Sequence, residues 1–144
     1  NGLRANVTHI FDGILITEFV TYHGMERSGL TSILAAEYLL DSGRLNESSE
    51  YLADAEERGY FGADLFNLRG VLFSLSGNPA EGLVEFEKAL GIAPGSPTLW
   101  KNYSVSLWTN ARYEDSIAAA LRAVDLNPLL QEQLRPILEH AVNL

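Results

Sequence analysis

The chain has 144 residues, 47% of them hydrophobic, and its 19 acidic and 10 basic residues give a formal net charge of −9. This length supports one domain with a sizeable core, and the acidic balance argues against nucleic acid or an anionic membrane surface as the main partner. Cysteine is absent, which excludes disulfides, thiolate catalysis and cysteine zinc sites. Because the first residue is Asn1 and not Met, we expect a piece of a longer protein.

The first predicted element lies within residues 1–28. Its apolar residues have helical spacing: Val7, Ile10, Phe11, Ile14, Leu15 and Tyr22. Residues 14–22 are also rich in β-branched residues and could alternate as a strand. We expect a helix, because a lone strand among helices has no pairing partner. Charged residues interrupt the apolar run, so we expect no membrane insertion. The apolar face is too large to leave in water, which predicts packing on the next element or a homodimer contact.

From residue 29 onward the sequence repeats with a period of 34 residues. The rows are 29–62, 63–96 and 97–130, and prolines at 94 and 128 mark the ends of the last two. Small residues recur in two columns, where paired helices must approach closely: Ala36, Gly70 and Ser104 in one, and Ser48, Gly82 and Ser116 in the other. Each row therefore predicts two packed helices.

Turn residues divide each row in the middle. They are Ser42-Gly43, Gly77-Asn78-Pro79 and Asn110-Ala111. Glycine is favoured just past a helix end, and proline is favoured at a helix start. The predicted helices span 30–42, 46–58, 63–76, 79–92, 97–109 and 113–126.

The last predicted element covers residues 131–144. Its apolar side chains fall on one helical face, formed by Leu134, Ile137, Leu138 and Val142. A terminal repeat exposes an apolar face unless something covers it, so this segment is expected to be a capping helix. Pro136 should kink this helix or mark its start.

The repeated columns resemble the tetratricopeptide pattern, W-x2-L-G-x2-Y, then A-x3-F, then P. The middle row carries Phe66-x2-Arg69-Gly70-x2-Phe73, Gly82-x3-Phe86, Ala89 and Pro94, and the third row carries Trp100, Tyr103, Ser104, Leu107 and Pro128. The first row is degenerate, with Ser32 in place of the large aromatic residue and Tyr60 in place of the proline. The resemblance covers residues 29–130.

This resemblance implies an all-α fold, a right-handed superhelix of three helical hairpins with the capping helix and an extra N-terminal helix. It also implies a protein–protein interaction module, such as an adaptor or a chaperone-like subunit, and favours a cytoplasmic location. The alternative is an accessory or regulatory domain of a larger enzyme whose catalytic part lies outside this chain.

Chemistry-bearing motifs are scarce in the sequence. The three histidines are widely spaced, and no phosphate loop, nucleophile elbow or paired-histidine metal motif is present. Glu50, Asp54 and Glu57 share one predicted helix face, which we interpret as a solvated outer surface. We therefore expect no catalytic activity in these residues, no cofactor and no metal site.

The resemblance also implies which residues face a partner, because the first helix of each repeat lines the concave side. The predicted groove residues are Ile33, Glu37, Leu40, Asn67, Val71, Lys101, Val105 and Trp108, with Trp108 at the centre. The same columns also hold Ser74, Leu75 and Thr109.

The family's best-known groove binds a terminal carboxylate through lysine, arginine and asparagine. That set is absent, because the basic columns hold Ile33, Thr98, Glu132 and Pro136. The expected ligand is an apolar or amphipathic peptide or helix, with basic flanks as one option. Two alternatives stay open: the aliphatic residues pack between neighbouring helices, and Trp108 covers the capping helix.

Overall fold

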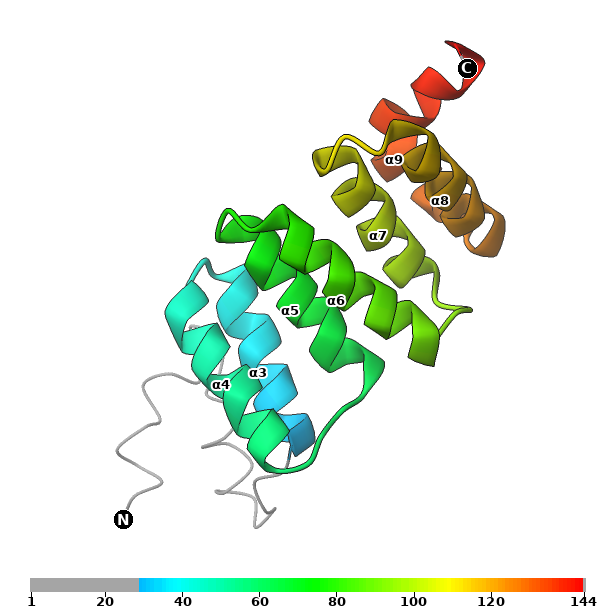
Figure 1. Ribbon diagram of the computed structural model, residues 1–144. Coiled ribbons are helices and arrows are strands. Elements are labelled where there is room, and N and C mark those ends of the chain that lie inside the picture. The colour runs from blue at the N-terminus through cyan, green and yellow to red at the C-terminus, as the bar shows by residue number, and fades with distance from the viewer. Residues whose placement is uncertain (1–28, 144) are drawn as a thin grey trace, which may run out of the picture. The chain divides into compact units, whose positions relative to one another are not determined.

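A computed structural model describes residues 29–143, which form helices joined by short turns (Figure 1). No strand occurs in this part of the chain, as expected for an all-α fold. None of the helices it describes is long and apolar enough to cross a bilayer. The expected N-terminal helix, its packing and its dimer contact fall in residues 1–28, outside the described residues.

The chain divides into two compact units, residues 1–61 and residues 62–144. This division falls beside the end of the first 34-residue row. Unit one contributes one described hairpin, and unit two contains the helices of the second and third rows together with the C-terminal segment.

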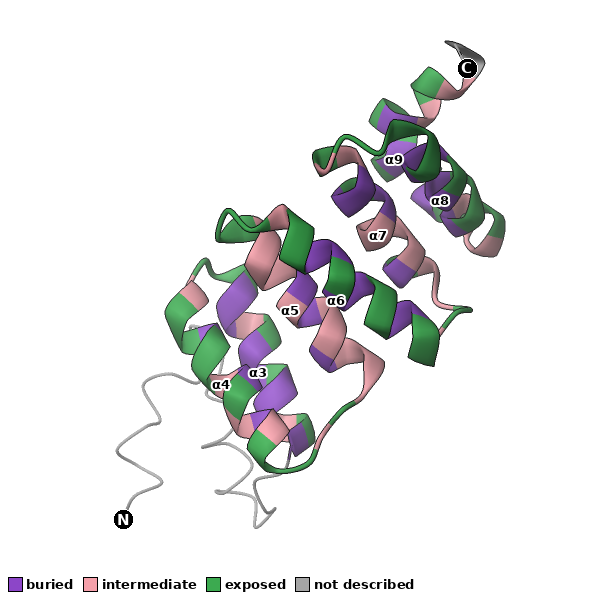
Figure 2. Cartoon of the chain, in the orientation of Figure 1, coloured by how far each residue is buried: buried purple, intermediate pink, exposed green. Residues whose placement is uncertain are grey.

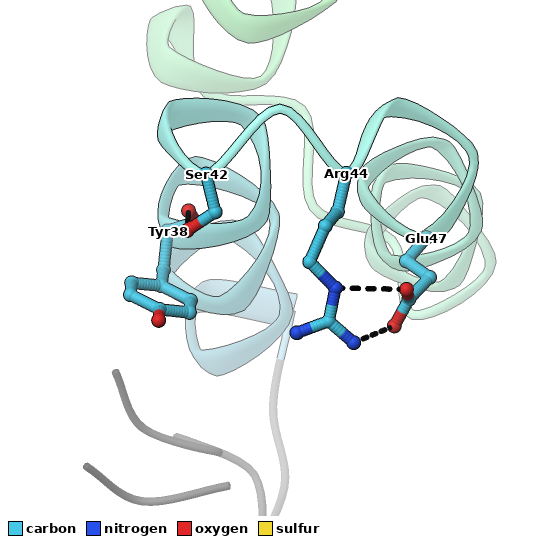
Figure 3. A network of polar contacts seen from close by, with 4 residues as sticks. All are labelled: Tyr38, Ser42, Arg44 and Glu47. Atoms are coloured by element: carbon cyan, nitrogen blue, oxygen red, sulfur yellow. Dashed lines mark hydrogen bonds and ion pairs between the residues drawn. The ribbon is translucent and has the colours of Figure 1, made fainter. Parts of the chain in front are cut away.

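The hairpin of unit one consists of α3 (Gly29–Asp41) and α4 (Leu45–Glu57). The chain reverses at Gly43, whose φ of 77° suits glycine. Polar contacts fix both sides of the turn (Figure 3): the Ser42 hydroxyl donates to the Tyr38 carbonyl at 2.9 Å, and the Arg44 guanidinium donates twice to the Glu47 carboxylate. These contacts hold the end of α3 and the start of α4 in place.

Unit two contains two further hairpins and a C-terminal helix. The first hairpin is α5 (Ala63–Leu75) with α6 (Pro79–Ile92), and the second is α7 (Pro97–Thr109) with α8 (Tyr113–Leu126). A short 3-10 turn, η2 (Pro128–Leu130), leads into α9 (Gln131–Leu138) and then η3 (Glu139–Asn143).

The six helices predicted from the rows each begin and end within one residue of the observed bounds. Proline occupies the first turn of α6 and of α7, where its missing N–H leaves no helix hydrogen bond unmade. The Ser96 hydroxyl caps α7 by accepting from the Leu99 amide at 3.3 Å. Pro136 lies inside α9, which begins at Gln131, so the prediction that Pro136 could mark the helix start is wrong.

The two helices of each hairpin approach most closely at the small residues predicted for that purpose. In α5–α6 a Cβ atom placed on Gly82 would lie 2.7 Å from the Gly70 carbonyl oxygen. In α7–α8 the Ser104 hydroxyl donates to the Ser116 carbonyl at 2.8 Å, and the Ser116 hydroxyl donates to the Ser104 carbonyl at 2.7 Å. These four positions are buried, and Figure 2 shows buried residues recurring along all four helices.

Polar contacts also join the two hairpins of unit two. The Asn110 amide donates to the Pro79 carbonyl at 3.0 Å, linking the end of α7 to the start of α6. The Tyr103 hydroxyl donates to the Glu87 carboxylate at 3.2 Å. Burial raises the pKa of Tyr103 above its ordinary value, and the negative charge of Glu87 adds to the rise. These contacts fix the register of α6 against α7.

The C-terminal segment covers the outer side of the second hairpin. Its Leu130, Leu134 and Ile137 form one buried cluster with Ile117, Ala120 and Ala123 of α8. Burial of this aliphatic surface provides the main free energy that holds α9 on α8.

Candidate functional site

A groove of about 230 Å³ lies between α5 and α7. Its apolar walls are Val71 and Leu75 of α5, Val105 of α7, and Phe86, which reaches it from α6. Leu75 is 59% exposed and Val105 is 49% exposed, so water contacts both in the free protein. Exposed apolar side chains that face each other across a groove are the kind of surface that another chain covers.

The groove has an internal repeat. Val71 and Val105 are 34 residues apart, and so are Leu75 and Thr109, so α5 and α7 line it with equivalent positions. The equivalent positions of the first row, in unit one, are Glu37 and Asp41, which are acidic and exposed. The apolar character of these positions therefore belongs to the second and third rows alone.

Polar side chains lie along one side and the floor of this groove. The Asn102 amide nitrogen on α7 donates to the Asn67 amide oxygen on α5 at 2.8 Å. Ser74 and Thr109 donate to carbonyls of their own helices, Gly70 at 2.9 Å and Val105 at 3.0 Å. Ser106 differs: it is only 3% exposed, and its hydroxyl has no hydrogen-bond partner among the described residues.

The charges of α5 and α7 lie outside the groove lining. The Arg69 guanidinium is 3.6 Å from the buried Glu85 carboxylate, which also pairs with Lys88 at 3.4 Å. The Lys101 ammonium donates to Gln133 of α9 at 3.2 Å. All eight lining side chains are uncharged.

Four of the predicted groove residues belong to this site or border it. Val71 and Val105 line it, and Asn67 holds the lining residue Asn102. Lys101 precedes Asn102 on α7 but contacts the C-terminal helix.

Trp108 does not line the groove. Its ring packs against the cluster formed by α8 and α9, with the Tyr113 ring centroid at 4.7 Å and the His140 ring centroid at 4.8 Å. These are the contacts expected of the alternative in which Trp108 covers the capping helix. We therefore centre the candidate site on Val71 and Val105.

The remaining predicted residues, Ile33, Glu37 and Leu40, belong to unit one. Ile33 is 1% exposed and Leu40 is 6% exposed, whereas Glu37 is exposed. The two aliphatic side chains are thus buried positions of α3, and only Glu37 presents a group to solvent.

Phe86 and Ser106 are lining residues that the repeat pattern did not single out. Phe86 belongs to the second helix of its row, but Gly70 has no side chain, and the Phe86 ring occupies that space. A Cβ atom on Gly70 would lie 2.7 Å from the Phe86 ring. The pairing of a glycine with a phenylalanine in the facing column was the signal that could have identified this residue.

Metal-binding chemistry has no visible basis in this part of the chain, since the described residues contain no group of three or more histidine, aspartate or glutamate side chains suited to an ion. The sequence was also compared with known proteins. No model of a known protein family matches it, and no curated protein is similar to it.

Proposed function

We propose that this chain is a protein-interaction module, an adaptor or chaperone-like subunit, that binds a peptide segment of a partner in the groove between α5 and α7. The observation that carries this proposal is the apolar, uncharged groove with Leu75 and Val105 half exposed on its walls. Covering such side chains stabilises a complex through the hydrophobic effect.

The shape and polarity of the site favour a peptide over a small cofactor. Its volume of about 230 Å³ is below the roughly 300–1,000 Å³ of pockets that enclose whole ligands. Beside it, the Asn67–Asn102 hydrogen bond uses one donor and one acceptor. Each amide has a second polar atom, and together the two can pair with a main-chain N–H and C=O of a bound segment.

The fold that we propose for the hairpins is the tetratricopeptide-like superhelix. Its support is positional: turn residues, close helix contacts and groove residues all recur at the same 34-residue offset. In such a solenoid the first helices of successive repeats line one face, as α5 and α7 do here.

Selection from a displayed random-peptide library tests the function. Peptides enriched on the immobilised protein should bind Val105→Asp at least about tenfold more weakly, because the introduced carboxylate must be desolvated against apolar walls. Leu121→Asp on α8 is the matched control, since Leu121 is 53% exposed and lies outside the groove. It should bind the peptides as the unaltered protein does.

Circular dichroism and a thermal melt of both variants establish that each is folded. If no peptide is enriched, or if Val105→Asp binds the enriched peptides unchanged, the groove is not the binding site and the proposal fails.

A further inference from the structure

We infer that the groove accepts one uncharged aliphatic side chain of leucine size from the bound segment, and that the Ser106 hydroxyl hydrogen-bonds a main-chain amide group beside it. This inference rests on the proposed function, because it names the chemistry of the segment that the groove recognises.

The walls and the volume favour a single apolar side chain. Val71, Leu75, Phe86 and Val105 surround the space from three helices, α5, α6 and α7. Contact with such walls is non-directional and grows with the apolar area covered. A volume of about 230 Å³ holds one side chain with the adjoining main chain and leaves no room for a longer enclosed ligand.

The charge distribution excludes an acidic or basic side chain from this position. A carboxylate or an ammonium group buried here would lose its hydration and gain no ion pair from the lining. The nearest cations of α5 and α7 are committed elsewhere, Arg69 to Glu85 and Lys101 to Gln133. Complementarity to the groove therefore requires an uncharged side chain.

Ser106 adds the polar part of the specificity. A buried hydroxyl without a partner lowers the stability of a protein, and most such groups in native structures are satisfied. The equivalent position in the second row is Leu72, so the helix scaffold itself accepts an apolar residue there. A hydroxyl at a lining position, 97% buried and without a partner in the described residues, points to a hydrogen bond made with the ligand.

A titration with a capped amino acid tests the side-chain class. N-acetyl-leucine methylamide should shift the backbone amide NMR signals of Val71, Val105 and Thr109, with a dissociation constant on the order of 1 mM for a ligand of this size. N-acetyl-aspartate methylamide should bind at least about tenfold more weakly. Equal binding of the two compounds, or leucine shifts located elsewhere, would overturn the inference.

Two serine variants separate a ligand contact from a structural role. Ser106→Ala should weaken capped-leucine binding about three- to tenfold, the effect of one hydrogen bond, with an unchanged or higher melting temperature. Ser116→Ala is the matched control, because its hydroxyl already bonds within the protein. It should lower the melting temperature and leave binding unchanged. A Ser106→Ala protein that melts earlier and binds equally well would assign the hydroxyl to the fold and overturn its part of the inference.

The two proposals can fail separately. Displayed peptides that depend on Val105 while capped leucine leaves the groove signals unmoved would keep the function and overturn this inference. Capped leucine bound at the groove with no peptide ever enriched would overturn the function and support the chemistry of the pocket.

Discussion

The α5–α6 and α7–α8 hairpins use equivalent positions, yet they bring their helices together by different means. In α5–α6 two glycines, Gly70 and Gly82, allow the backbones to approach because neither has a side chain. In α7–α8 two serines occupy the same columns, and each hydroxyl bonds the carbonyl of the other residue. Close packing of two helices thus tolerates a small polar residue where its hydroxyl finds a carbonyl acceptor.

The residues around these contacts change together. Phe86 fills the space beside Gly70, whereas the equivalent of Phe86 in the next hairpin is Ala120, which lies near Ser104 in sequence register. A large residue faces the glycine and a small one faces the serine. The difference teaches that the pair of columns, and not each column alone, is constrained by packing.

The largest expected effect comes from closing the glycine contact. Gly82→Leu should lower the free energy of unfolding by about 3 kcal/mol, at the upper end of overpacking, because its side chain would meet the Gly70 carbonyl. Gly91→Leu on the same helix is the control, since no atom lies within 4 Å of a Cβ there. Chemical denaturation measures both. Equal stability of the two variants would contradict the close contact.

The next effect contrasts Ser74 and Trp108, which are equivalent positions of α5 and α7. Trp108→Ala should cost about 2–3 kcal/mol of stability, less than for a fully buried tryptophan, because the half-buried ring packs on the α8–α9 cluster. Ser74→Ala removes one hydrogen bond within α5 and should cost less than about 1 kcal/mol. Thermal melts separate them. A stable Trp108→Ala protein that has lost peptide binding would return Trp108 to the groove.

A smaller effect tests the coupled columns. Gly70→Ser should cost about 1–2 kcal/mol, because its Cβ would meet the Phe86 ring. In a Phe86→Ala background, which reproduces the serine–alanine pair of the next hairpin, that cost should largely vanish. The double-mutant cycle should then give a coupling free energy of about 1 kcal/mol or more. Additive effects would show that the two columns are independent.

The smallest effect concerns the turns. Gly43, Gly77 and Ala111 are spaced by 34 residues, and all three have positive φ, which is 62° at Ala111. Glycine adopts this region freely and alanine does not, so Ala111→Gly should raise stability by about 0.5–1 kcal/mol after its greater unfolded-state entropy is deducted. Gly77→Ala should lower stability by a similar amount. A loss on Ala111→Gly, measured by denaturation, would contradict this interpretation.

Helix positions and hairpin contacts were predictable because they depend on local signals. Glycine at 43 and 77 and proline at 79 end and start helices for reasons set by backbone sterics. The small residues of the two close-contact columns likewise require no knowledge of the neighbouring hairpin. These features explain why the predicted helix bounds agree with those observed.

The groove was only partly predictable, because it depends on packing between helices that are distant in sequence. Val71 and Val105 could be assigned from the column to which they belong. The direction of Trp108 could not, since helical spacing leaves open whether a flanking residue faces the groove or the next helix. Phe86 and Ser106 become groove residues through Gly70 and through the approach of α7, which a single row does not reveal.

The paired serine hydroxyls have a consequence for local opening. If α8 separates from α7, both hydroxyls and both carbonyls lose their partners in one step. Two buried hydrogen bonds broken together make partial opening unfavourable, so the amide protons of α7 and α8 should exchange with solvent deuterium as one cooperative unit. The α5–α6 hairpin has no such cross-bond at its two glycines, and its helices are freer to exchange at separate rates.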